Sequence, residues 1–494
     1  MKCLAIDIGA SSGRGIVGVF AEDGSGLETR EVHRFENGYV EKAGRKVWDL
    51  GALMRGVTES IRAAAADAAG GPLLSVGIDT WGVDYGYVGP GGELLGEVFS
   101  YRDSRTDDAV PWVHERIPQA ELYSIAGTQH MAINTVFQVA DDVMRAPELV
   151  ESAEHMLMMP DLLAFMLTGE AAAEYTIAST SEMLDAVSRD WSDGICSRIG
   201  FPRRLLPKVV MPGESWAPVR PELARELGAP EDLRLIRVGS HDTASAVAAV
   251  PVTGAAENWI YISSGTWSLV GMELYAPVLT DAALEANFTN EGGVGGTIRF
   301  LRNVSGLWII QELRRLWREK DGSDHDWPYI IQCADAAPPH AAFINPDSQM
   351  FVSPDDMRHA LYQNCSDAGF APPDGIGPTA RCVFESLAFA YRRAVEGLAR
   401  VTGRGVEHIH VVGGGSQNDL LCRLTAEACG VTVHAGPAEA TALGNLVVQA
   451  VALGGLPDVA AGRELVARTE EPRVYLPEGG EEVEEAYARF LEVE

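Results

Sequence analysis

The sequence predicts an α/β protein whose sheets are covered by helices on both faces. Short apolar runs typical of buried strands end in loops rich in glycine and hydroxyl side chains. Helical patterns such as LGALMRGVTESIRAAAADAAG, with Gly70 expected as its C-cap, lie between these runs. Strands that alternate with helices are typical of α/β folds. The runs are LLSVGIDTWGVDYGYV, LRLIRVGSHDTASAVAAV, WIYISSGTWSLVGM and HIHVVGGGSQNDLLCRLTAEACG.

The length of 494 residues predicts two domains, because a single core rarely grows to that size. The run PVTGAA, from Pro251 to Ala256, has the proline, glycine and small-residue composition of a domain joint. We expect an N-terminal domain over 1–250 and a C-terminal domain over 251–494. After the joint, WIYISSGTWSLVGMEL loosely repeats the pattern of LAIDIGASSGRGIVGVF, an apolar strand, a polar loop and a second strand. This similarity suggests a duplicated fold facing a shared cleft.

Composition limits the partners that the chain is expected to have. A formal net charge of −31 disfavours nucleic acid, which is bound through Lys and Arg, and anionic membrane surfaces. No apolar run reaches the roughly 18 residues of a membrane span. The N-terminus does not read as a signal peptide, because Asp7 interrupts its apolar stretch and Arg14 follows. We therefore expect a cytoplasmic protein, a monomer or a homodimer, without nucleic acid or membrane as partner.

The seven cysteines are widely spaced and include no CxxC, so neither a zinc ribbon nor thioredoxin-type chemistry is indicated. Cys365 and Cys382 flank a loop rich in proline and glycine and could pair if oxidised. Reduced thiols are expected in the cytosol.

The loop between the first two predicted strands has the groups that a phosphate and its metal ion require. Asp7, Ser11, Ser12 and Arg14 supply a carboxylate, two hydroxyls and a cation beside several backbone N–H groups. A P-loop is excluded because the chain has no Gly-Lys dipeptide, and GASSGRG does not match GxGxxG. Neither HRD nor DFG of the protein kinases occurs. A hairpin that cradles phosphate remains, with a tight structural Gly/Ser hairpin as the alternative.

A second candidate site follows the strand that ends at Val238. Gly239 and Ser240 form a turn, and an alanine-rich helix follows, so Asp242 lies at or beside the helix N-terminus, which favours its ionised form. Ligands of α/β folds bind at the carboxyl ends of strands, where such a carboxylate can accept a hydroxyl proton. An ordinary N-cap is the alternative. His241 either orients a substrate or packs.

Two further stretches have weaker signals. In GIDTWGVD, Gly82 permits close approach of the backbone to a ligand, Trp81 offers an apolar plane, and Asp79 and Asp84 can accept from sugar hydroxyls. A β-hairpin with turn residues is the alternative. In VVGGGSQNDLL, the triplet from Gly413 to Gly415 has room for the flat face of a nucleotide, or serves only as a turn.

Taken together, these stretches closely resemble the FGGY family of carbohydrate kinases. The matching motifs span nearly the whole chain in the family's order, which makes the resemblance far more specific than any one of them. They are DIGASSGR, GIDTWGVD, YRDSRT, EYT, SHDTASAV, SSGTWSL, NEGG, GLW, VVGGGSQN and ALGN.

The resemblance implies two ribonuclease-H-like domains of the sugar kinase, actin and heat-shock ATPase type around a central cleft. It implies ATP as co-substrate, Mg²⁺ served by Asp7 through water, and Asp242 as proton acceptor. The residues that it assigns to the sugar are Gly82, His241, Asp242, Thr243 and Asn303. Those that it assigns to the nucleotide are Ala10, Ser11, Ser12, Gly13, Arg14, Thr266, Gln311 and Gly414.

Within the family, GIDTWGVD and YRDSRT favour the branch that phosphorylates L-rhamnulose at C1, in L-rhamnose catabolism, over the glycerol, xylulose and fuculose branches. A kinase of another ketose or polyol, such as L-fuculose or L-xylulose, is the alternative. A non-catalytic sugar sensor on the same fold is the remote alternative. It would be expected to lack Asp7 or Asp242 or to carry an added DNA-binding segment, whereas both carboxylates are present and only three residues precede the first strand.

Overall fold

The computed structural model describes residues 1–21, 24, 26–253, 258–352 and 354–493, and it confirms the α/β class. The chain forms two compact units, each built from several stretches of sequence. Unit 1 comprises Met1–Thr253, Glu273–Phe300 and Ala440–Thr469, and unit 2 comprises Gly254–Met272, Leu301–Glu439 and Glu470–Glu494. Residues 254–256 of the expected joint lie outside the described part, and the expected boundary between residues 250 and 251 stays a prediction.

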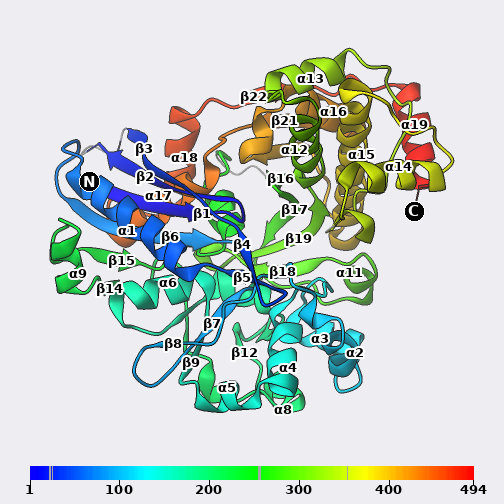
Figure 1. Cartoon of the computed structure of the whole chain (residues 1–494). Helices are drawn as coiled ribbons and strands as arrows, with labels where there is room; N and C mark the ends of the chain where they lie inside the picture. Colours follow the sequence, from blue (N-terminus) through cyan, green and yellow to red (C-terminus); the bar gives the residue numbers. More distant parts are fainter. Residues whose placement is uncertain (22–23, 25, 254–257, 353, 494) are drawn as a thin grey trace. The chain divides into compact units, whose positions relative to one another are not determined.

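Unit 1 is organised around a six-stranded sheet with the order β14-β15-β6-β1-β2-β3. Its first strand, β1, pairs antiparallel with β2 and parallel with β6, so β1 occupies the interior of the sheet (Figure 1). The strands are β1 (Lys2–Ile8), β2 (Ser12–Phe20), β3 (Leu27–Glu36), β6 (Leu73–Thr80), β14 (Trp216–Pro218) and β15 (Arg234–Ile236).

Short strands and helices complete unit 1. The smaller sheets are formed by β4 (Tyr39–Lys42) with β5 (Arg45–Trp48), by β7 (Tyr85–Val88) with β8 (Leu94–Leu95) and β9 (His155–Met158), by β10 (Ala173–Glu174) with β13 (Val209–Val210), and by β11 (Leu184–Asp185) with β12 (Asp190–Trp191). The helices are α1 (Leu50–Ala66), α2 (Ala109–His114), α3 (Gln119–Ala126), α4 (Thr135–Arg145), α5 (Pro147–Ser152), α6 (Met159–Thr168), α7 (Tyr175–Ala178), α8 (Asp193–Ile199), α9 (Pro221–Glu226), α10 (Asp242–Ala248), α11 (Asp281–Glu285), α17 (Ala440–Ala452) and α18 (Val459–Thr469).

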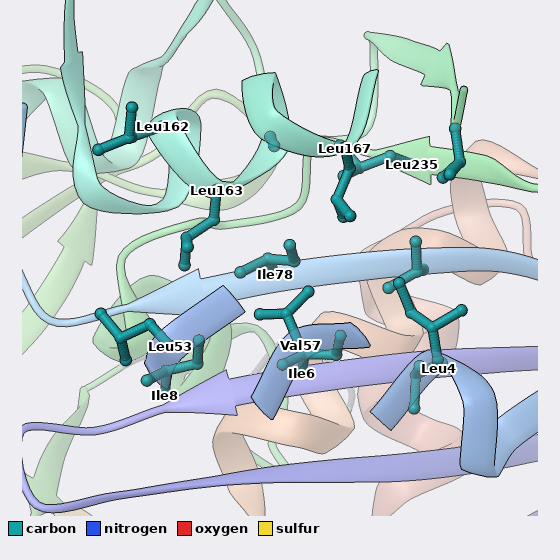
Figure 2. Close-up of a cluster of buried hydrophobic side chains, with 14 of the residues drawn as sticks. Leu4, Ile6, Ile8, Leu53, Val57, Ile78, Leu162, Leu163, Leu167 and Leu235 are labelled. Carbon is teal, nitrogen blue, oxygen red and sulfur yellow. The ribbon is translucent and has the colours of Figure 1, made fainter. Parts of the chain in front are cut away.

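The core of unit 1 forms where α1 and α6 pack on the sheet. Apolar residues of α1 recur every three or four positions, which places Leu53 and Val57 on one buried face. Figure 2 shows these side chains beside those of Ile6 and Ile8 from β1, with leucines of α6 on the side of Ile78. The α1 helix ends at Ala66, before the glycine expected as its C-cap, because the backbone at position 67 is already extended.

Helix α17 belongs to unit 1 although it lies late in the sequence, and Figure 1 shows it beside β1 and β6. It also contacts α10. The contact with α10 is close at Gly444, where a Cβ would lie 1.7 Å from the backbone oxygen of Ser245. Only glycine fits there without displacing a helix. This packing fixes α10, whose first residue is the predicted base, Asp242.

Unit 2 is organised around a seven-stranded sheet with the order β18-β19-β17-β16-β20-β21-β22. The residues of the edge strand β18 are assigned to unit 1. Here β16 pairs antiparallel with β17 and parallel with β20, the same arrangement that β1 has with β2 and β6. The strands are β16 (Trp259–Ser264), β17 (Trp267–Leu274), β18 (Thr289–Gly292), β19 (Ile298–Ser305), β20 (His408–Val412), β21 (Thr432–Ala435) and β22 (Arg473–Tyr475). The helices are α12 (Trp308–Asp321), α13 (Trp327–Asp335), α14 (Met357–Asp367), α15 (Ile376–Thr402), α16 (Asp419–Cys429) and α19 (Glu481–Leu491).

Cys365 and Cys382 are both buried in unit 2 as free thiols. Within the described residues, no helix is both long and apolar enough to cross a membrane.

Candidate active site

Two carboxylates lie side by side at the end of β1 and β6. The parallel register places Asp7 directly opposite Asp79, and both are buried. Oδ2 of Asp7 accepts hydrogen bonds from Nε and Nη2 of Arg14, at 3.1 and 2.8 Å, across the antiparallel pair of β1 and β2. The predicted metal residue and the predicted phosphate-binding cation are therefore in direct contact.

Asp79 is held from the opposite side by α17. Nδ2 of Asn445 donates a 2.6 Å hydrogen bond to Oδ2 of Asp79. Among the described residues, nothing donates a hydrogen bond to the buried Oδ1 of Asp79. Burial raises the pKa of Asp79 well above its usual range, and the neighbouring charge of Asp7 raises it further. The pair thus places acceptor oxygens at one edge of the sheet, where the raised pKa of Asp79 favours its protonated form.

Asp242 reaches the same edge of unit 1. The backbone N–H of Thr80, at the end of β6, donates to the oxygen of Ser240, and Thr80 forms a parallel bridge with His241. Helix α10 then begins at Asp242, as the strand–turn–helix pattern predicts. These contacts bring Asp242 close to Asp79 in the fold, although the two lie far apart in sequence.

The two oxygens of Asp242 differ in their contacts. Oδ1 accepts from the N–H of Thr243 at 2.6 Å and from its hydroxyl at 3.2 Å. Nε2 of His241 lies 3.4 Å from the same oxygen. Burial raises the pKa of Asp242, and the charge of Asp7 adds to the increase. Because the side chain remains 32% exposed, a substrate hydroxyl has access to this carboxylate.

The turn before Asp242 is fixed by Glu174 and Thr176 of the EYT motif. Oε2 of Glu174 accepts from the N–H of Ser240, and the hydroxyl of Thr176 accepts from the N–H of His241, both at 3.1 Å. Burial raises the pKa of Glu174 to about 7. The role of this motif is therefore to position the 240–242 turn.

His241 has two buried charged neighbours that sequence reasoning did not select. Nη2 of Arg299 lies 3.0 Å from Nδ1 of His241, and Oε2 of Glu291 lies 3.2 Å from it. Glu291 is part of the NEGG motif, which could have drawn attention to it, but Arg299 lies on β19 outside every motif that the sequence analysis used.

Gly82 lies against the hydroxyl side chain of Thr180, from which a Cβ at position 82 would be 3.2 Å away. The same hydroxyl accepts from the N–H of Val83 at 3.1 Å. Gly82 is half-buried, so its backbone remains accessible beside this contact.

Asp84 and Trp81, considered above as sugar contacts, are instead buried in a polar core of unit 1. Oδ2 of Asp84 accepts from Nε1 of Trp48 at 2.7 Å and from Nε1 of Trp81 at 2.9 Å, and the N–H of Tyr101 adds a third donor at 3.2 Å. The two indole rings are in contact, with centroids 4.2 Å apart and planes tilted by 38°. Both side chains are therefore used within the protein.

The predicted phosphate loop is a tight turn between β1 and β2. The N–H of Gly9 donates to the oxygen of Ser12 at 2.9 Å, and Nδ2 of Asn37 donates to the oxygen of Gly9 at 2.7 Å. A Cβ on Gly13 would lie 2.2 Å from the ring of Phe35, so the loop passes close to β3. Ser11 at its tip is exposed, and Ala10, Ser12 and Arg14 are half-buried.

In unit 2, the turn between β16 and β17 is contacted by two other segments. A Cβ on Gly306 would lie 2.7 Å from the backbone oxygen of Thr266, and the N–H of Trp308 donates to that oxygen. A Cβ on Gly415 would lie 2.0 Å from the hydroxyl of Ser264, so the glycine triplet packs on the same turn.

Three of the predicted nucleotide residues thus lie on segments that meet at this turn. Thr266 lies half-buried in the turn itself. Gly414 belongs to the glycine triplet that packs on this turn, and it is exposed. Gln311 is half-buried in the first turn of α12, where its N–H donates to Leu307. Asn303, predicted to contact the sugar, lies half-buried on β19 within the part of that strand assigned to unit 2.

Family models match both halves of the chain. The model described as the FGGY family of carbohydrate kinases, N-terminal domain, matches residues 2–249, and the C-terminal domain model matches residues 260–453. The chain belongs to the FGGY family of carbohydrate kinases. It is therefore a sugar kinase, with ATP as its co-substrate.

A curated relative of this FGGY kinase covers almost the entire chain. The rhamnulokinase of Bacteroides thetaiotaomicron is 40% identical over 486 residues, which cover 98% of both chains. This similarity extends through both domain models.

Solved structures support the two-domain FGGY kinase fold. The xylulose kinase of Lactobacillus acidophilus covers 100% of this chain and 96% of its own, with a TM-score of 0.78 at 16% identity. The glycerol kinase of Plasmodium falciparum with ADP covers 99% and 97%, with a TM-score of 0.78 at 14% identity. The family and the fold expected from the motifs are confirmed.

Proposed function

We propose that this chain transfers the γ-phosphoryl group of ATP to the C1 hydroxyl of L-rhamnulose, giving ADP and L-rhamnulose 1-phosphate in L-rhamnose catabolism. The observation that supports this substrate most strongly is the 40% identity to a rhamnulokinase over 98% of both chains. We further propose a cytoplasmic enzyme that acts as a monomer or a homodimer on small molecules alone.

In this proposal Asp242 is the general base. Because Thr243 and His241 are directed at Oδ1, Oδ2 is the oxygen left for the substrate. It takes the proton of the C1 hydroxyl while the hydroxyl oxygen forms a bond to the γ-phosphorus and the bond from that phosphorus to ADP breaks. Gly82, His241, Thr243 and Asn303 would contact the sugar.

The nucleotide phosphates would be held by the loop of residues 10–14 and by the β16–β17 turn with its neighbours. The loop offers backbone N–H groups, two hydroxyls and Arg14, which suit phosphate oxygens. In unit 2, Thr266, Gln311 and Gly414 would contact the nucleotide.

The carboxylates of unit 1 fit a magnesium ion that is bound largely through water and phosphate. Within the described residues, no group of three or more His, Cys, Asp or Glu side chains gathers as a complete ligand set. Mg²⁺ in phosphoryl-transfer enzymes needs only one or two carboxylates beside phosphates and waters. Asp7, opposite the partly unsatisfied Asp79, meets that requirement. When bound, the ion would neutralise charge on the phosphates.

The substrate is tested with an ADP-release assay on L-rhamnulose, L-fuculose, L-xylulose and glycerol. We expect the highest kcat/KM with L-rhamnulose and a product phosphorylated at C1. A higher value for L-fuculose or L-xylulose would replace the substrate while keeping the family's chemistry. Sugar binding without ADP release on any member of the panel would favour the sensor.

A further inference from the structure

A line of polar side chains connects the buried Arg299 to the partly exposed Asp242 through His241. Nη2 of Arg299 lies 3.0 Å from Nδ1 of His241, and Nε2 of the same ring lies 3.4 Å from Oδ1 of Asp242. Arg299 is completely buried on β19, and His241 is 7% exposed. The two ends of the imidazole thus face a permanent donor and the predicted base.

The chemistry of Arg299 determines the direction of this contact. A guanidinium has only donors and stays charged, so a hydrogen bond between Nη2 and Nδ1 requires Nδ1 of His241 to accept, whereas a proton on Nδ1 would be donated to Oε2 of Glu291, 3.2 Å away. A neutral imidazole that accepts at Nδ1 carries its proton on Nε2. That N–H is then on the side of the ring that faces Asp242.

The carboxylate of Glu291 forms an ion pair with the buried guanidinium of Arg299 and compensates its positive charge. Its Oε2 lies 3.1 Å from Nη2 of Arg299, while Nε of Arg299 donates to the oxygen of Gly292 at 2.8 Å. Burial opposes ionisation of Glu291, but the charge of Arg299 favours it, and the pKa of Glu291 is lowered. Because a buried ion pair contributes little net stability, this pair is a candidate for a role in positioning His241.

We propose that Arg299 is a positioning residue that holds His241 in its Nε2–H tautomer and directs this N–H toward Oδ1 of Asp242. Together with Thr243, the ring then fixes the carboxylate and leaves Oδ2 for the hydroxyl proton of the substrate. This inference rests on the proposed function for the identity of the substrate and for Asp242 as its base. The other charged groups near this turn are Asp7, Asp79, Arg14, Glu174 and Glu291.

The tautomer is measured directly on sugar-free protein. Nitrogen-15 NMR of histidine-labelled enzyme at about pH 8.5, where an ordinary imidazole is neutral, distinguishes Nε2–H from Nδ1–H. The resonance is assigned by its loss in His241→Gln. We expect the Nε2–H tautomer. An Nδ1–H tautomer in the wild type would overturn the proposal, since the ring would then donate to Glu291, and this measurement requires no destabilising variant.

The catalytic consequence is tested with Arg299→Met/Glu291→Gln, which replaces both charges at once and leaves no unpaired buried ion. We expect His241 to lose its fixed tautomer and kcat to fall by about tenfold to a hundredfold, with the KM for ATP unchanged. Glu291→Gln alone keeps the Arg299 donor and should keep the Nε2–H tautomer. An unchanged tautomer and kcat in the double variant would refute the role of Arg299.

Unit 2 offers a matched control in a second buried arginine–glutamate pair beside a histidine. Nε of Arg381 donates to Oε1 of Glu385 at 2.6 Å, and Nε2 of His340 lies 3.9 Å from the same oxygen. Arg381→Met/Glu385→Gln should lose comparable stability but keep the His241 tautomer and kcat. An equal loss of kcat in this control would mean that Arg299 contributes only to stability.

The two proposals fail separately. If the sugar panel excludes L-rhamnulose, the assigned substrate is wrong, while the tautomer in the sugar-free enzyme still decides the role of Arg299.

Discussion

Nδ2 of Asn445 donates a 2.6 Å hydrogen bond to Oδ2 of Asp79, which joins α17 to the end of β6 across 366 positions of sequence. The next turn of α17 extends the contact, because Nε2 of Gln449 donates to Oδ1 of Asn445 and to the oxygen of Leu4. The ALGN motif is thus a structural link to the carboxylates at the site.

Replacing Asn445 with leucine should destabilise unit 1 and reduce turnover. The change leaves Asp79 without its buried donor, which costs about 1–3 kcal/mol. Urea unfolding should give a lower midpoint, and kcat should fall because Asp79 lies opposite Asp7. Gln363→Leu, which removes an exposed amide bonded to Asp367 in α14, is the control and should change neither.

Gly444→Ala tests the close approach of α17 to α10. Its Cβ would meet the backbone oxygen of Ser245 at 1.7 Å, so one helix must move, at about 1–3 kcal/mol or more. We expect lower stability together with lower kcat, because α10 begins at Asp242. Gly405→Ala, with nothing within 4 Å of its added Cβ, is the control. Equal behaviour of the two variants would contradict the packing argument.

Asp242→Asn should reduce kcat by about 10²- to 10⁴-fold while nucleotide binding persists, because the amide cannot take the hydroxyl proton. Asp281→Asn provides a matched change, since Asp281 is likewise the first residue of a helix but is exposed. Kinetics and ADP binding are measured for both. Near-normal turnover of Asp242→Asn would remove this residue from the proposed role.

Thr266→Ala should raise the KM for ATP more than the KM for the sugar, because the β16–β17 turn is the proposed phosphate contact of unit 2. Thr402→Ala, which removes a hydroxyl bonded to the oxygen of Leu398 within α15, should leave both values unchanged. The opposite selectivity, with the sugar affected more than ATP, would assign Thr266 to the sugar instead.

Glu182→Gln should stabilise the protein increasingly as the pH rises from 5 to 8. Burial raises the pKa of Glu182 to about 8, while Nδ2 of Asn134 donates to its carboxyl at 2.8 Å. Between the ordinary Glu pKa of about 4.3 and about 8, the folded protein binds a proton that the unfolded chain has released, so stability falls with rising pH. Glutamine removes this dependence. Melting temperatures across that range, with the exposed Glu151→Gln as control, should reveal it, and parallel curves would contradict it.

Local patterns were sufficient to predict the fold class and the position of Asp242. The strand, turn and helix around Asp242 lie within one short segment, so its placement at the helix start follows from the order of residues alone. Contacts between residues that are far apart in the sequence cannot be predicted from local patterns. Arg299 contacts His241 across 58 positions of sequence, so no local pattern marks Arg299 as part of the site. Trp48 donates to Asp84 across 36 positions, so the sequence alone leaves Asp84 available to a sugar.

The predicted end of α1 also differs from the structure. A glycine near the end of a helical pattern predicts a C-cap, and Gly70 does adopt a left-handed φ of 77°. The helix nevertheless ends at Ala66, because the carboxylate of Asp67 accepts from the N–H of Ala69 and forms a local turn first.

The membership of α17 in unit 1 has a consequence for how the protein is made. A ribosome synthesises the stretch 1–253 long before residues 440–469, yet Gln449 and Asn445 of the later stretch bond to the oxygen of Leu4, the hydroxyl of Ser75 and the carboxylate of Asp79. Until residues 440–469 have been synthesised, the N-terminal part of unit 1 lacks the helices α17 and α18 that complete it. Unit 1 can therefore complete its fold only after residue 469 has left the ribosome, although its first residues are the first to be made.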